Sequence, residues 1–136
     1  MLTIELDRIP KTILRGNSNA QSWRAKAAAK REMRELGYQY GTLLKERHPD
    51  VEFPLRGELA ISIAYWNLRR VDCDNMLIGY KYFLDGLQDI RRKFKSAGVF
   101  MDDSQITLMS ISRHKGEPRS LILIRKHDEV TDDVVI

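Results

Sequence analysis

The stretch Arg69–Gln105 reads RRVDCDNMLIGYKYFLDGLQDIRRKFKSAGVFMDDSQ and contains the pattern that decides the fold. Asp74 or Asn75 is expected to cap a central helix, and Gly98, directly after Ala97, is expected to stop it. Between them, apolar residues recur at three- and four-residue steps, which predicts one buried helix face: Met76, Tyr80, Phe83, Leu87, Ile90 and Phe94.

The segments before this helix predict a strand, a helix and a second strand. Leu2, Ile4 and Leu6 alternate with polar residues, as in a short strand. After a loop at 10–19, a helix is expected from an N-cap at Ser22 to His48, where Pro49 ends it. Glycines at 37 and 41 weaken this helix. The next strand is expected from about Gly57 to Trp66, with alternate residues on one face: Leu59, Ile61, Ile63 and Tyr65.

Two further strands are expected after the central helix. They span 106–111 and 121–124, and residues 114–118 form the turn between them. The order strand, helix, strand, helix, strand, strand predicts an α/β fold: a single compact domain, residues 1–136, with a mixed β-sheet flanked by two main helices.

Composition narrows the class of protein. The chain has 136 residues, 43% of them hydrophobic and 31% charged, which fits one globular domain. Its apolar runs are too short to span a bilayer, and Met1–Leu6 shows no secretory signal. The single cysteine, Cys73, excludes an internal disulfide and fits a reducing, cytoplasmic setting.

Charge is unevenly distributed along the chain, which has a formal net charge of +4. Basic residues dominate the segment 8–34 and cluster again at 91–95, whereas acidic residues mark a tail at about 128–136. Each basic run alone is compatible with a solvated helix face. Together with an acidic site, they are typical of a protein that binds a polyanion through its backbone. The basic residues of the first segment are Arg8, Lys11, Arg15, Arg24, Lys26, Lys30, Arg31 and Arg34.

Carboxylates occur at both ends of the central helix. Asp72 and Asp74 are two residues apart in a chain expected to be extended, so both side chains lie on the same side. At about 100° per residue, Lys81 and Asp85 fall on the helix edge of Asp74. The second pair, Asp102–Asp103, follows the helix and can join this group only if the chain folds back. Such hard oxygen ligands suit Mg²⁺ or Mn²⁺, which can activate water for phosphodiester hydrolysis.

A simpler interpretation of the same residues also exists. Asp74 and Asn75 can be N-caps, and Asp102 and Asp103 can be turn residues. Lys81 and Asp85 can form a surface pair at i,i+4, which contributes a few tenths of a kcal/mol. Spacing alone does not separate this interpretation from a metal site.

Three motifs resemble the RusA-like endodeoxyribonuclease family, the Holliday junction resolvases of bacteria and prophages. They are RRVDCDN, then K-x3-D-x-L from Lys81 to Leu87, then AGVFMDDSQ. They cover about 40 residues in the family's order, although five residues separate Asn75 from Lys81, three more than in the shortest family form. The longer spacing is similar to that of the phage-type branch. The N-terminal half matches only at a Pro, an Asn-containing loop and a basic helix.

The resemblance implies an activity, a site and partners. It implies a RusA-like fold and an Mg²⁺-dependent enzyme (Mn²⁺ is an alternative) that cuts Holliday junctions in DNA recombination and repair, bacterial or phage-encoded, acting as a homodimer. Asp72, Asp74 and Asp103 would bind the metal, Lys81 would be the catalytic lysine, and Asp102 has a weaker claim. Arg69 and Arg70 would contact DNA; for residues 11–34 charge alone suggests contacts, by Lys11, Arg15, Arg24, Lys26 and Lys30.

Two other functions remain open at this point. One is a nuclease of the same fold that acts on flaps or forks, and the other is a DNA-binding protein without catalysis. Cys73 is expected to be a small buried hydrophobe. Both tryptophans, Trp23 and Trp66, are expected to be core or packing residues, although an exposed Trp66 near the site could stack on a base.

Overall fold

The computed structural model describes residues 1–15, 22–88 and 97–129 as a four-stranded sheet with two main helices. The strands are β1 (Leu2–Leu6), β2 (Leu59–Asn67), β3 (Ile106–Lys115) and β4 (Arg119–Lys126). The helices are α1 (Trp23–Arg47) and α2 (Cys73–Leu87). Short 3-10 turns lie at Thr12–Leu14, Asp103–Gln105 and His127–Glu129. This confirms the predicted single α/β domain and the order of its elements.

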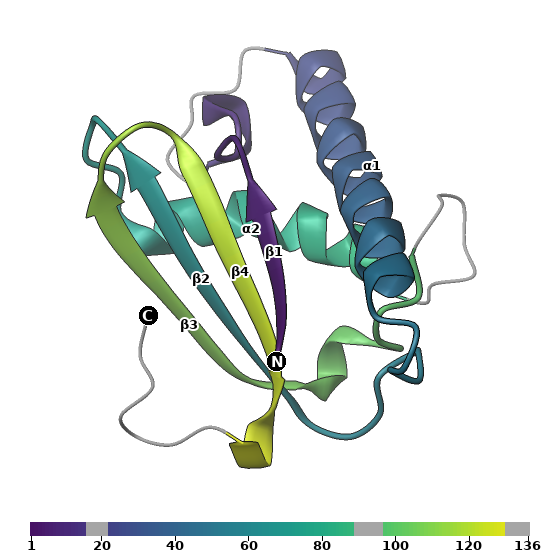
Figure 1. Ribbon diagram of the computed structural model, residues 1–136. Helices are drawn as coiled ribbons and strands as arrows, with labels where there is room; N and C mark the ends of the chain where they lie inside the picture. Colours follow the sequence, from purple (N-terminus) through teal and green to yellow (C-terminus); the bar gives the residue numbers. More distant parts are fainter. Residues whose placement is uncertain (16–21, 89–96, 130–136) are drawn as a thin grey trace.

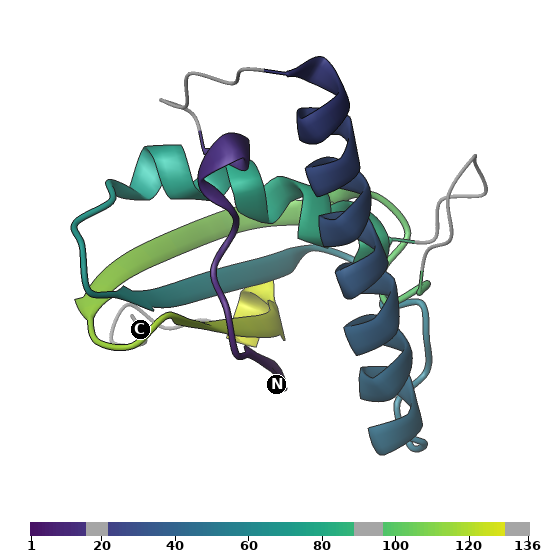
Figure 2. The same ribbon diagram turned by 90° about the horizontal axis from the view of Figure 1, so that it is seen from above.

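The sheet is mixed, as predicted, and its order is β1-β4-β2-β3. β2 runs parallel to β3 and antiparallel to β4, which also pairs antiparallel with β1. The helix α2 forms the crossover between the two parallel strands and lies across one face of the sheet (Figures 1 and 2). The core lies between them, because the predicted strand face from Leu59 to Tyr65 is fully buried against α2 residues such as Tyr80 and Phe83.

Both ends of α1 agree with the sequence prediction. The Ser22 side chain accepts a hydrogen bond from the Ala25 amide at 3.3 Å, and the helix ends at Arg47, before the His48-Pro49 step. The helix continues through Gly37 and Gly41, the two residues expected to weaken it. Both glycines are buried where other segments approach closely, so packing outweighs their low helix propensity.

The two helices cross at a pair of glycines. A Cβ on Gly86 of α2 would lie 2.1 Å from the Arg34 carbonyl oxygen, and one on Gly37 of α1 would lie 2.2 Å from the Phe83 carbonyl oxygen. Both neighbours are backbone atoms, which cannot rotate away. The close crossing therefore fixes how the C-terminal half of α2 sits on α1.

We expect Gly86→Ala to destabilise the protein by about 2 kcal/mol or more, because it overpacks this crossing. In an ordinary helix the same change stabilises by about 1 kcal/mol, so the sign of the effect is diagnostic. Urea unfolding measures it, with Gln39→Ala at an exposed position of α1 as the near-neutral control. A more stable Gly86→Ala protein would contradict the close crossing.

The prediction that α2 continues to Ala97 is wrong, because the helix ends at Leu87 and Gln88 is extended. The chain returns at Ala97, whose amide donates to the Gly86 carbonyl at 2.8 Å, and the Val99 amide donates to the Leu87 carbonyl at 2.7 Å. These bonds use the carbonyls at the helix end. The predicted helical residues Ile90 and Phe94, and the basic cluster at 91–95, lie outside the described residues.

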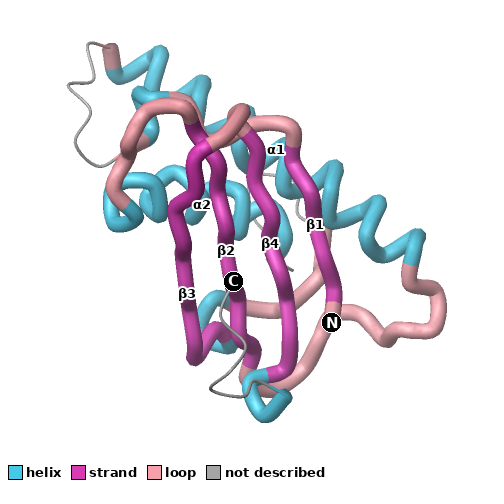
Figure 3. The backbone as a smooth tube through the Cα atoms, turned by 60° about the vertical axis from the view of Figure 1, so that its left-hand side comes forward, coloured by secondary structure: helices cyan, strands magenta, loops and turns pink. Residues whose placement is uncertain are grey.

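The last two strands are longer than predicted. β3 extends to Lys115 and β4 begins at Arg119, so the turn is limited to 116–118. β3 lies at one edge of the sheet, next to α2 (Figure 3). None of the helices in the described ranges combines the length and apolar character needed to cross a membrane.

Candidate functional site

The first acidic pair lies at the N-terminal end of α2. Asp72 occupies the N-cap position without making a side-chain cap, and its Oδ1 lies 3.4 Å from Arg113 Nη1 and 3.6 Å from Arg70 Nε. Asp74 lies in the first helical turn, where its Oδ1 accepts the Asn75 amide at 3.0 Å. Both carboxylates are exposed. The prediction that Asp74 or Asn75 caps α2 is wrong, because the helix begins at Cys73 and its N-cap residue is Asp72. Both carboxylates of the pair are accessible to a ligand.

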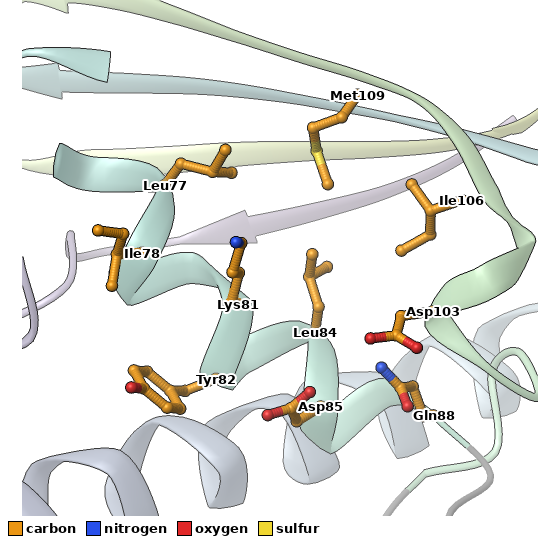
Figure 4. Close-up of a pocket in the computed structure, with 10 residues that line it drawn as sticks. All are labelled: Leu77, Ile78, Lys81, Tyr82, Leu84, Asp85, Gln88, Asp103, Ile106 and Met109. Carbon is orange, nitrogen blue, oxygen red and sulfur yellow. The ribbon is translucent and has the colours of Figure 1, made fainter. Parts of the chain in front are cut away.

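A pocket of about 550 Å³ runs between α2 and the start of β3 (Figure 4). Its polar residues are Lys81 and Asp85 on α2, Gln88 just after the helix, and Asp103 in the turn before β3. Its other lining residues are mainly apolar: Leu77, Ile78, Tyr82, Leu84, Ile106 and Met109. The pocket thus combines an apolar wall with one amine and two carboxylates.

Lys81 and Asp85 share one edge of α2, as predicted, but they do not form the surface pair. The ion-pair partner of Asp85 is Arg34 of α1, whose Nε lies 3.9 Å from Asp85 Oδ2. In the described part of the chain, no carboxylate lies within ion-pair distance of Lys81, which is exposed at the pocket. The Lys81 amine is therefore available to an anionic ligand.

The second acidic pair is held by Gln105. The Gln105 side-chain oxygen accepts the amides of Met101 and Asp102 at 2.7 and 3.1 Å, and its side-chain nitrogen donates to the carbonyls of Leu55 and Gly57 at 2.9 and 3.0 Å. Asp102 caps the short 3-10 turn by accepting the Ser104 amide at 3.1 Å. Asp102 therefore has the turn-forming role of the simpler interpretation, whereas Asp103 lines the pocket.

The surroundings of Asp85 and Asp103, the two carboxylates of the pocket, disfavour their ionised forms. A hydrogen bond shared with Asp102 raises the pKa of Asp103, and burial and the Asp102 charge act in the same direction. Burial raises the pKa of Asp85, and the negative charge of Asp103 adds to it, although Arg34 opposes the shift. A cation near Asp85 and Asp103 would lower both pKa values, because it favours the ionised forms.

Within one chain, Asp103 does not join Asp72 and Asp74. Asp103 lies at the pocket with Asp85, and Asp85 is roughly 20 Å along the α2 axis from Asp72 at 1.5 Å per residue. Across the described ranges, no group of three His, Cys, Asp or Glu side chains is close enough to hold a metal ion. The structure thus brings together Lys81, Asp85 and Asp103, and leaves the first acidic pair at the other end of the same helix.

The basic residues expected to contact DNA fall into two regions. Arg69 and Arg70 are exposed beside Asp72. Lys11 and Arg15 flank the 3-10 turn Thr12–Leu14, and the others lie on the first half of α1; several of these residues contact the protein itself. Lys11 pairs with Glu32 at 2.6 Å, Arg15 donates to the Pro10 carbonyl at 3.2 Å, and Arg24 and Lys30 lie over the rings of Trp23 and Tyr82; Lys26 is half-buried.

Sequence reasoning missed two basic residues near the β3–β4 turn, Arg113 of β3 and Arg119 of β4. Arg113 contacts Asp72, and Trp66 lies between His114 and Arg119, its neighbours in β3 and β4. Only the register of the strands brings these residues together, so no local motif marks them. The prediction for Trp23 is wrong, because this residue is 77% exposed. Trp66 is a packing residue and not a core residue: it is half-buried and stacks on His114, on the sheet face opposite α2. Cys73 is also half-buried, with its Sγ 3.7 Å from the Tyr65 hydroxyl.

Comparison with known proteins gives no independent assignment. No protein-family model matches the chain, and no curated protein matches it at the significance required.

Proposed function

We propose that this protein is a divalent-metal-dependent endodeoxyribonuclease that cuts Holliday junctions. The observation that carries the proposal is one helix, α2, which has two exposed aspartates at its start and an accessible lysine at a carboxylate-containing pocket further along. This arrangement occurs within the motifs that resemble the RusA-like family. The function therefore rests on the resemblance together with the exposure of the residues that it names.

The donor set of the first acidic pair fits Mg²⁺. This ion is usually bound through one or two carboxylates, waters and substrate phosphate oxygens, so Asp72 and Asp74 are sufficient protein ligands for it. Their competing partners are weak, since Asp72 lies 3.4 Å or more from both arginine nitrogens and its side chain is 61% exposed. A bound Mg²⁺ would lower the pKa of a water and polarise the phosphate. The two arginines can then turn toward the phosphate.

Lys81 would stabilise negative charge on the phosphate. It has no ion-pair partner in the described part of the chain, so it reaches an anionic substrate without breaking a contact. Electrostatic stabilisation of this kind is most effective where apolar walls exclude water, and Leu77, Leu84 and Met109 line the same pocket.

We further propose that Asp103 reaches the first acidic pair of a second copy. The pocket extends along α2 beside β3, whose outer edge has no neighbouring strand among the described elements. A two-fold axis that passes beside the middle of α2, perpendicular to the helix, would place two such helices antiparallel, and each Asp103 would then face the partner's Asp72 and Asp74. A homodimer of this type also supplies two sites for the two incisions that a four-way junction needs.

The direct test is cutting of a labelled synthetic four-way junction, with a linear duplex of the same sequence as the control. We expect paired incisions in the junction with Mg²⁺ and none with EDTA. Cutting of flaps or forks but not junctions would support the related nuclease activity. Tight binding of junctions without any cutting would support the non-catalytic alternative, which the separation of the carboxylates within one chain favours.

A further inference from the structure

The end of the sheet next to Asp72 collects basic side chains from three elements. Arg69 lies in the loop after β2, Lys115 ends β3, and Arg119 begins β4. All three are exposed. Within the described residues, none of them has a carboxylate within 4.0 Å, whereas Arg8 and Lys11 each have one at less than 3.0 Å. Each of these three positive charges therefore lacks an ion-pair partner in the described part of the chain.

A stacked row of side chains holds Arg119 in place. The register places Trp66 between His114 and Arg119, with all three on the face of the sheet opposite α2. The His114 ring stacks on Trp66 at 4.8 Å and 23°, and the Arg119 guanidinium carbon lies 3.9 Å from the Trp66 ring centre. A guanidinium held over an indole ring loses rotational freedom but keeps its N–H donors, which match the oxygens of a phosphate.

On the other face of the sheet, a basic residue of the same strand contacts the acidic pair. Arg113 precedes His114 in β3, and its side chain reaches the α2 side of the sheet, where Nη1 lies 3.4 Å from Asp72 Oδ1. Successive side chains of one strand point to opposite faces. This end of the sheet therefore carries basic groups on both faces. Arg113 lies beside Asp72 on the α2 side, and Arg119 lies over Trp66 on the opposite side.

We propose that this end of the sheet binds the sugar-phosphate backbone of the DNA arm that leaves the acidic pair. We call it the strand-end surface, and it consists of Arg69, Lys115, Arg119 and Trp66. This inference rests on the proposed function and adds a substrate-binding surface to it. The contacts are to phosphate, so they position the arm without reading its sequence. The stack keeps the Arg119 guanidinium ready for this contact, with little entropy to lose when DNA binds.

The test compares two double variants that lose the same charge. Lys115→Ala/Arg119→Ala removes two groups of the strand-end surface, and Arg56→Ala/Lys126→Ala removes an exposed arginine and lysine near the other end of the sheet. Binding of a labelled four-way junction and of a linear duplex is measured in EDTA over a salt series, with thermal unfolding as a check on the fold.

We expect the strand-end variant to bind both DNAs about 60-fold more weakly at 0.1 M salt, because each phosphate contact contributes about eightfold there by counterion release. Its slope of log affinity against log salt should fall by about 1.8, while the control changes little. In a Trp23→Phe background, the fluorescence of Trp66 should change when junction binds.

Two results would overturn the inference. If the unmodified protein binds DNA but the two double variants bind it equally well, the strand-end surface is not the contact and the proposed nuclease function is unaffected. If the unmodified protein binds neither junction nor duplex, the nuclease proposal fails together with the surface.

Discussion

Under the proposed function, Asp74→Asn is expected to abolish junction cutting, with a loss of about 10³-fold or more, because it would remove a charged metal ligand worth several kcal/mol to the transition state. The fold should be kept. The Asp74 oxygen that accepts the Asn75 amide is retained in the asparagine side chain, and the position is exposed. Single-turnover cutting of a labelled junction in Mg²⁺ measures the effect.

Binding separates this result from a loss of structure. The Asp74→Asn protein should bind the junction at least as tightly as the unmodified protein in EDTA, because one negative charge facing phosphate is removed. The control is Asp50→Asn, an exposed carboxylate in the turn before β2, which should cut normally. Normal cutting by Asp74→Asn would remove Asp74 from the site.

Mixing two inactive proteins is expected to restore activity. If each site combines Asp74 of one chain with Asp103 of its partner, Asp74→Asn and Asp103→Asn are both inactive alone. In a mixed dimer, one site receives both substitutions and the other receives neither. With random exchange of subunits, half of the dimers are mixed and each has one intact site, so nicking should recover to roughly one quarter of the unmodified level.

The matched control is a mixture of Asp72→Asn with Asp74→Asn. Both substitutions affect the same end of α2 in one chain, so each site of a mixed dimer still contains one of them. No recovery is expected. Failure of the Asp74→Asn and Asp103→Asn mixture to recover, after subunit exchange has been verified, would show that the sites are not shared between copies.

The helices and strands can be predicted from the sequence where interactions between residues close in the chain determine them. The alternation Leu2, Ile4, Leu6 predicts β1, and Ser22 and Pro49 predict the ends of α1. The end of α2 was mispredicted because it depends on a distant segment. Apolar spacing continues to Phe94, but the carbonyls of Gly86 and Leu87 bond to the amides of the returning chain. No periodicity within α2 contains that information.

In the candidate site, too, local spacing predicts some positions and contacts with distant segments decide the others. The spacing correctly predicts that Lys81 and Asp85 lie on one helix edge. The ion-pair partner of Asp85, however, is Arg34 of α1, which lies near it because the two helices cross there. The position of Asp103 depends on Gln105, whose bonds to Leu55 and Gly57 tie its turn to the segment before β2. Such contacts join residues about 50 positions apart, and a motif does not encode them.

The sheet order has a consequence for how the chain folds during synthesis. β1 contains residues 2–6, yet its neighbour in the sheet is β4, with Leu2 opposite Ile124. β4 also separates β1 from β2, so β1 has no sheet partner until residues 119–126 have left the ribosome. Contacts of such long sequence separation slow folding. Until β4 arrives, the apolar residues Leu2, Ile4 and Leu6 remain a segment that chaperones can bind.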